Sequence, residues 1–317
     1  MREENKQMRI LSAIGMILVV AGHLGYSLFD VGGLFPYYSF HVFIFLFVSG
    51  YFYREEAEQQ LLRYIGKKCK ALLLPYFIWN LVYGILAVLL HRTGFSIGGE
   101  LTLWNLFIEP FVSGHQFLYQ FPAWFVPALF LIEVLNVLGR KVLFFLHLKK
   151  EWLIFAVSLL LGIATVALAK GGHVWGYYKF PGRLLFMMPG FQLGRIYKGK
   201  LENRVNKISD GRYFFVVVGV QLLTTICCRG LAFSAVWVTG FANAAFIPYL
   251  TVVTGIAFWL RISDWISRIP SACSWFMEIG RHTYAIMMHH VFWFFVVNSI
   301  CYLLSRTTVW CAEFDTA

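Results

Sequence analysis

The sequence predicts an all-α protein, a polytopic bundle of transmembrane helices with about ten spans. Two observations lead to this prediction. Of the 317 residues, 59% are hydrophobic and only 14% are charged, whereas a soluble domain carries roughly 25% charged residues. The hydrophobic residues also gather in long runs, and a helix needs about 20 apolar residues to cross a hydrocarbon core. No polar linker divides the chain, so we expect a single membrane domain over residues 1–317.

The charge balance supports a membrane location. The chain has 27 Lys and Arg against 16 Asp and Glu, a net charge of +11. In a soluble protein this excess would suggest nucleic-acid binding. Here the basic residues cluster between apolar runs, as they do in cytoplasmic loops. We therefore expect a lipid bilayer as partner, no nucleic acid, and localisation as a multi-pass protein of the cell membrane.

Ten apolar runs follow one another along the chain. They cover residues 10–29, 36–53, 71–91, 121–147, 152–169, 184–197, 213–228, 231–245, 246–260 and 283–304. The first run is long for a signal peptide and no A-x-A-like cleavage site follows it, so we expect an uncleaved span. Basic segments at 54–70, 139–151 and 195–212 place these loops and the N-terminus in the cytoplasm. Residues 231–260 leave two interpretations open: two short helices, giving ten spans, or one long tilted helix, giving nine.

A histidine interrupts the first apolar run. His23 lies in the otherwise uncharged stretch 10–29, where an ionisable side chain is costly to bury and therefore indicates a functional site. At about 100° per residue, Arg9 and Ser12 share its helical face. An imidazole titrates near neutral pH and can take a proton from a hydroxyl group. The alternative is a histidine that only hydrogen-bonds a neighbouring helix.

A second histidine, His41, lies near the start of the next run. Histidines on two facing spans could ligate a haem, so a membrane cytochrome is a minor alternative. The sequence has no H-E-x-x-H motif and no carboxylate cluster, so we otherwise expect no metal. Its six cysteines show neither a CxxC pair nor zinc-finger spacing, and no disulfide framework is expected.

Polar residues also open two later runs. The segment KKCKALLLPYFIWN (67–80) begins with lysines that lead directly into an apolar run. This run is either a positively charged anchor or a clamp for the phosphates of a cytosolic ligand such as coenzyme A. The segment IGRHTYAIMMHH (279–290) ends in two adjacent histidines, His289 and His290. They point about 100° apart, so at most one of them faces the same cavity as Thr283.

Taken in this order, six segments resemble the acyltransferase-3 family of integral membrane acyltransferases, which O-acylate surface glycans and related acceptors. The segments are ILVVAGH (17–23), FHVFIFLFVSGYF (40–52), LLLPY (72–76) with its basic run, WFVPALF (124–130), MPGFQLGR (188–195) and IGRHTYAIMMHH (279–290). They extend over nearly the whole chain. The resemblance implies a ten-helix domain that moves an acyl group, usually acetyl from acetyl-CoA, to a hydroxyl group.

The resemblance implies catalytic roles for three histidines. His23 is the expected general base. His41 or His290 is expected to orient the acceptor hydroxyl or to relay a second proton. The family's late pattern is matched by Gly280, Thr283, Ile286 and His290, with Met287 where tyrosine is usual.

The resemblance also implies a donor site at the cytoplasmic face. Lys67, Lys70 and Arg9 are expected to bind acetyl-CoA or another acyl-CoA. The family's first-helix pattern has an arginine eleven residues before the histidine, where this chain has Ser12. Arg9, one turn earlier on the same face, is the expected substitute.

The resemblance also implies partners and alternative functions. The expected acceptor is a cell-surface glycan or its lipid-linked precursor, and a separate extracytoplasmic transferase is a further expected partner. The membrane domain attached to some serine racemases also resembles this family. A transporter of an amino acid or glycolipid is therefore the main alternative, and a structural component of a biosynthetic complex is a third.

Overall fold

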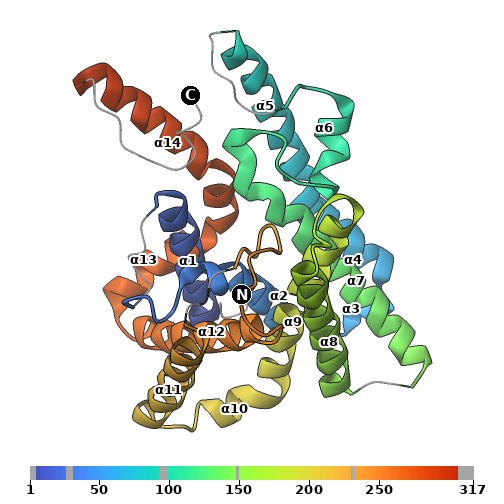
Figure 1. Ribbon diagram of the computed structural model, residues 1–317, viewed down its shortest axis with the longest axis vertical. Helices are drawn as coiled ribbons and strands as arrows, with labels where there is room; N and C mark the ends of the chain where they lie inside the picture. Colours follow the sequence, from blue (N-terminus) through green and yellow to red (C-terminus); the bar gives the residue numbers. More distant parts are fainter. Residues whose placement is uncertain are drawn as a thin grey trace. The chain divides into compact units, whose positions relative to one another are not determined.

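The computed structural model describes residues 5–25, 31–92, 99–147, 150–229, 231 and 233–305. Within these ranges every named element of secondary structure is a helix (Figure 1). No strand is present there, and the β-structure consists of isolated bridge residues, among them the antiparallel pair Ser234 and Thr239. The predicted all-α class is confirmed.

Helices occupy nine of the ten runs that were expected to cross the membrane. They are α1 (Lys6–His23), α2 (His41–Phe52), α5 (Leu74–His91), α7 (Phe125–Phe145), α8 (Glu151–Lys170), α9 (Lys179–Ile196), α11 (Asp210–Cys228), α12 (Ile247–Ser267) and α14 (Thr283–Ser305). Short helices connect them: α3 (Glu56–Gln59), α4 (Leu61–Lys68), α6 (Leu103–Phe107), α10 (Glu202–Val205) and α13 (Pro270–Arg281). Short stretches of other helix types include the π-helix η2 (Cys69–Leu73) and the 3-10 helix η4 (Leu118–Trp124).

Several helices have the length and composition of membrane spans. Five described stretches meet both requirements: Leu61–His91, Leu118–Phe145, Glu151–Lys170, Asp210–Cys228 and Thr283–Ser305. Their outward side chains are apolar as well, as in α11, where Phe215 is 80% exposed and Leu223 64% exposed. A helix that is hydrophobic all round is typical of a membrane span. The chain is therefore a helical membrane protein.

Residues 231 and 233–245 contain no helix, so of the two interpretations of 231–260 the one with two short helices does not hold. Ser234 and Thr239 exchange backbone hydrogen bonds across a tight turn. Val238 and Gly240 have φ angles of 54° and 79°, in the left-handed region that interrupts a right-handed helix. The following helix, α12, begins only at Ile247. Residues 231–260 therefore contribute to one long helix, as the nine-span interpretation expects. That helix begins at Ile247 and not near residue 231.

The described residues form two compact units, each assembled from separated stretches of sequence. Unit 1 lies within Met1–Val19, Ser27–Glu55 and Leu138–Thr283. Unit 2 lies within Val20–Tyr26, Glu56–Val137 and Tyr284–Ala317.

In unit 1, α2 and α9 pack with their backbones in contact (Figure 1). A Cβ atom on Gly50 would collide with the carbonyl group of Phe191, and one on Gly194 would collide with the carbonyl group of Phe47. Only glycine fits at these two positions. Small residues of this kind let membrane helices approach closely, because no side chain separates the backbones.

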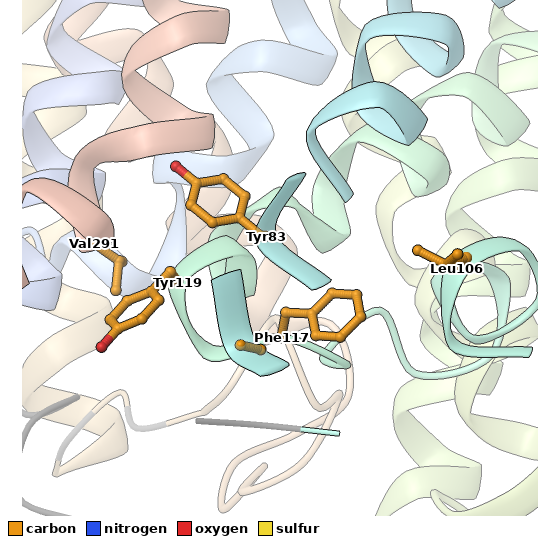
Figure 2. Packing of buried hydrophobic residues seen from close by; sticks show 6 residues of the cluster. Tyr83, Leu106, Phe117, Tyr119 and Val291 are labelled. Carbon is orange, nitrogen blue, oxygen red and sulfur yellow. The ribbon is translucent and has the colours of Figure 1, made fainter. Parts of the chain in front are cut away.

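The core of unit 2 joins α5, α14 and the segment that leads into α7. Figure 2 shows Tyr83, Phe117, Tyr119 and Val291 in one buried cluster, with Leu106 of α6 at its side. A second cluster consists of Tyr76, Ala123, Val126 and Met288. Both clusters take residues from α5, from α14 and from the stretch between α6 and the start of α7. Residues far apart in sequence are thereby held together in unit 2.

Candidate functional site

Two of the predicted site histidines lie side by side in unit 2. His23 is the last residue of α1, and His290 lies in the second turn of α14. Their ring centroids are 5.1 Å apart, with the ring planes inclined by 55°. Residues from opposite ends of the sequence thus form a pair of imidazoles.

The backbone determines where His290 carries its proton. Its Nδ1 lies 2.8 Å from the carbonyl oxygen of Ile286. A carbonyl oxygen only accepts hydrogen bonds, so Nδ1 must donate, and in the neutral ring Nε2 is then the acceptor. The Nε2 atom is buried and has no hydrogen-bond partner among the described residues. Beside His23, the structure therefore provides a buried nitrogen that can receive a proton or a hydrogen bond.

Aromatic rings flank the pair. Phe121 meets the His23 ring edge-on at 6.1 Å, and Phe294 meets the His290 ring at 5.7 Å. His115 stacks on Phe121, with centroids 4.3 Å apart and planes inclined by 26°. This third histidine was not predicted, because it lies in an irregular segment where no helical periodicity assigns a face. Its one signal in the sequence is a histidine among the aromatic residues that precede the segment WFVPALF.

A buried network of amides holds the segment that carries His115. The amide Nε2 of Gln116 donates to the Tyr76 hydroxyl at 3.0 Å and to Oδ1 of Asn80 at 2.7 Å. Asn80 Nδ2 in turn donates to the carbonyl oxygen of Leu106 at 2.7 Å. Tyr76, Asn80 and Gln116 are all buried. Hydrogen bonds in an apolar interior fix geometry, since breaking one leaves its partner unpaired. Oε1 of Gln116 has no such bond among the described residues.

His289 faces a different part of unit 2 from His290, as expected for adjacent helical positions. Its Nδ1 lies 2.7 Å from the hydroxyl of Tyr83. The Trp79 ring packs against it with a centroid distance of 4.2 Å. The two neighbouring histidines therefore have separate surroundings, α5 for His289 and the end of α1 for His290.

The predicted phosphate-binding lysines lie at the start of the helical stretch that continues into α5. Lys67 lies in the last turn of α4 and Lys70 lies in the π-helix η2, and both are exposed. Lys68, to which no role was assigned, donates to Glu133 of α7 at 2.7 Å. The Glu133 carboxylate is only 2% exposed. Lys68 thus neutralises a buried charge, while Lys67 and Lys70 are exposed at the surface.

Arg9 and His41 belong to unit 1. Arg9 Nη1 donates to the carbonyl oxygen of Gly280 at 3.3 Å. A Cβ atom on Gly280 would lie 2.5 Å from the Arg9 carbonyl oxygen and 2.7 Å from its Cγ. His41 Nδ1 lies 2.9 Å from the carbonyl oxygen of Tyr37, which again places the proton on Nδ1. Ser12, at the position of the family's arginine, is buried and donates to the carbonyl oxygen of Met8.

No group of three His, Cys, Asp or Glu side chains is placed to hold a metal ion within the part of the chain that the structure describes. The polar side chains described at this site are imidazoles and carboxamides. An imidazole can bind and release a proton, and a carboxamide donates and accepts hydrogen bonds.

Apolar helices around a histidine pair and buried amides define a multi-pass membrane protein with a polar interior site. A family model described as an acyltransferase domain, that of acyltransferase-3, matches residues 5–312, nearly the whole chain. The chain therefore belongs to the acyltransferase-3 family, as its six segments predicted. Membership makes it a membrane acyltransferase by family. Neither a curated protein nor a solved structure matches the sequence.

Proposed function

We propose that this protein transfers an acyl group, in the first place acetyl, from acyl-CoA to a hydroxyl of a cell-surface glycan or its lipid-linked precursor. The observation that carries the proposal is the His23–His290 pair, with centroids 5.1 Å apart and an aromatic ring on either side. Acyl transfer to an alcohol needs a base at the attacking oxygen, because a neutral hydroxyl is a weak nucleophile.

In this proposal His23 is the general base. Its imidazole takes the proton from the acceptor hydroxyl while the oxygen attacks the thioester carbonyl carbon. The carbon–sulfur bond then breaks, and the coenzyme A sulfur leaves and receives the proton, so that an ester and a free thiol result. The Nε2 of His290, an acceptor because Nδ1 is bonded to Ile286, orients the hydroxyl or relays the proton.

The donor site rests on positive charge outside the histidine pair. Lys67 and Lys70 would bind the phosphates of the acyl-CoA, as point charges that need no fixed geometry. Arg9, in place of the family's usual arginine, and His41, as an alternative orienting group, are proposed participants from unit 1. The proposal also includes a cell-membrane location, a cytoplasmic N-terminus and a separate extracytoplasmic transferase as partner.

Cells that produce the protein provide the test of this function. The ester-linked acetyl content of the surface glycan is measured by mass spectrometry for wild type, His23→Ala, His290→Ala and the empty vector. We expect acetylation above the vector in wild type. In His23→Ala the rate at which acetyl groups appear on the glycan should fall by a factor of about 10² or more, the usual contribution of a general base.

His173→Ala is the matched control, because this histidine is exposed and should leave acetylation unchanged. Wild-type acetylation that persists in His23→Ala would contradict the base assignment. No acetylation above the vector, together with uptake of a labelled amino acid or glycolipid without coenzyme A, would favour a transporter instead.

A further inference from the structure

Unit 1 contains an apolar cavity of about 310 Å³ between α8, α9 and α12. Phe155, Leu159 and Ile163 line it from α8, Pro189 and Leu193 from α9, and residues 246–253 complete it. Tyr249 is the one lining side chain with a polar atom, and its hydroxyl already donates to the carbonyl oxygen of Phe186 at 3.1 Å. A pocket of this volume reaches the lower range of ligand sites, and its lining suits hydrocarbon.

The cavity reaches the outer surface of the unit. Phe246 and Val253 belong to its lining, yet they are 54% and 41% exposed. Leu160 and Leu161 make the neighbouring surface of α8 apolar too. Because α8 has the length and composition of a membrane span, the surroundings of this surface are lipid chains. A lipid chain can therefore enter without leaving hydrocarbon.

One end of the cavity has a basic rim. The face of α8 that carries Phe155, Leu159 and Ile163 continues to Lys170, about 10 Å beyond Ile163 along the helix. Lys170 Nζ donates to the carbonyl oxygen of Asn243 at 2.8 Å. Lys179, at the start of α9, lies with Nζ 4.1 Å from the ring centroid of Trp237. Two ammonium groups thus lie at the end of α8 and the start of α9, next to the segment that leads into α12.

In the stretches of sequence that form α8, α9 and the approach to α12, the charge at this end is of one sign. The sequence contains no Asp or Glu between Glu151 and Glu202, and none between Asp210 and Asp264. Arg183 also contacts this region through its Nε, which donates to the carbonyl oxygen of Val236 at 3.0 Å. Lysines and tryptophans at the end of a span are typical of the lipid headgroup region. Clustered ammonium groups at the membrane surface attract the phosphates of anionic lipid headgroups.

We propose that this cavity binds one acyl chain of an anionic glycerophospholipid, whose phosphate lies against Lys170 and Lys179. The apolar lining accounts for the chain and the basic rim accounts for the headgroup. The proposal does not depend on acyl transfer, because none of these residues takes part in the proposed reaction.

Native mass spectrometry of the purified full-length protein tests the proposal with two probes, phosphatidylglycerol and phosphatidylcholine of identical chains. We expect wild type to retain phosphatidylglycerol in preference to phosphatidylcholine. Ile163→Trp should abolish retention by filling the cavity, whereas Leu160→Trp, on the exposed face of the same helix, should not. Lys170→Gln should weaken phosphatidylglycerol binding about five-fold, and Lys207→Gln, an exposed lysine elsewhere in unit 1, should have no effect.

Lys170 is exposed, so Lys170→Gln tests the headgroup contact even if Ile163→Trp impairs folding. Equal retention of the two lipids by wild type would overturn the assignment of an anionic headgroup. Equal retention by Ile163→Trp and Leu160→Trp would overturn the assignment of the chain to this cavity.

Discussion

Single side chains decide the protonation and charge of the buried groups in unit 2. His290 carries its proton on Nδ1 because the Ile286 carbonyl is the acceptor. The Glu133 carboxylate is buried and receives a hydrogen bond from Lys68 at 2.7 Å. A buried polar group is costly unless a partner of this kind satisfies it.

Removal of the Lys68 ammonium group tests this pairing. Lys68→Ala leaves the carboxylate of Glu133 buried and uncompensated, so we expect a loss of about 2–3 kcal/mol in the free energy of unfolding, because Lys68 itself is partly exposed. Thermal unfolding in detergent measures the effect. Lys67→Ala is the control, since Lys67 is exposed. If the two variants unfold at the same temperature, the ion pair does not stabilise the fold.

Gly280 offers a test of Arg9. A methyl group there would press on the backbone and side chain of Arg9, from which a Cβ atom would be only 2.5–2.8 Å away. If Arg9 binds the acyl-CoA phosphates, Gly280→Ala should raise the KM for acetyl-CoA several-fold and change kcat less. Gly211→Ala is the control, because a Cβ atom there meets nothing within 4 Å. An unchanged KM in Gly280→Ala would remove the support for a role of Arg9.

At the scale of whole elements, the close packing of α2 and α9 depends on Gly50 and Gly194. Gly194→Ala should force the two helices apart and lower the free energy of unfolding by about 2 kcal/mol or more, because the methyl group would meet backbone atoms. Gly219→Ala in α11 meets nothing within 4 Å and should be neutral or slightly stabilising. Thermal unfolding compares the two variants. Equal stability would contradict the close approach.

The elements also show how far the sequence predicts this fold. Apolar runs locate nine helices, since hydrophobicity over a long stretch is the strongest signal of a membrane span. The same criterion fails at 231–245, because apolar composition does not reveal the left-handed turn at Val238 and Gly240. It also gives no signal for His115, whose segment lacks helical periodicity. That histidine is placed by the amide network of Gln116, which only the packed structure shows.

For the molecule as a whole, the absence of a span at 231–245 determines on which side of the membrane the later loops lie. In a variant without native cysteines, we expect Lys207→Cys and Arg268→Cys to react with a membrane-impermeant reagent from one side. Ala244→Cys should react from the other, because α11 and α12 each lie between these positions. If residues 231–245 did cross, Ala244→Cys would react from the same side as Lys207→Cys.

The candidate site is likewise a property of the whole chain. His23 is conspicuous in the sequence because it interrupts an apolar run. Its neighbour His290 could be proposed only from the resemblance to a family, since no local pattern reveals that the end of α1 meets α14. The roles of Lys68 and Glu133 were not predicted for the same reason. Their pairing depends on the packing of α4 against α7.

Release of free coenzyme A thiol from acetyl-CoA by the purified protein in lipid vesicles tests the central claim most directly. We predict a rate above that of empty vesicles for wild type and for His173→Ala, and a rate lower by a factor of about 10² or more for His23→Ala. The same rate for His23→Ala and wild type would contradict a general base at this position. Wild type no faster than empty vesicles would contradict the use of acetyl-CoA as donor.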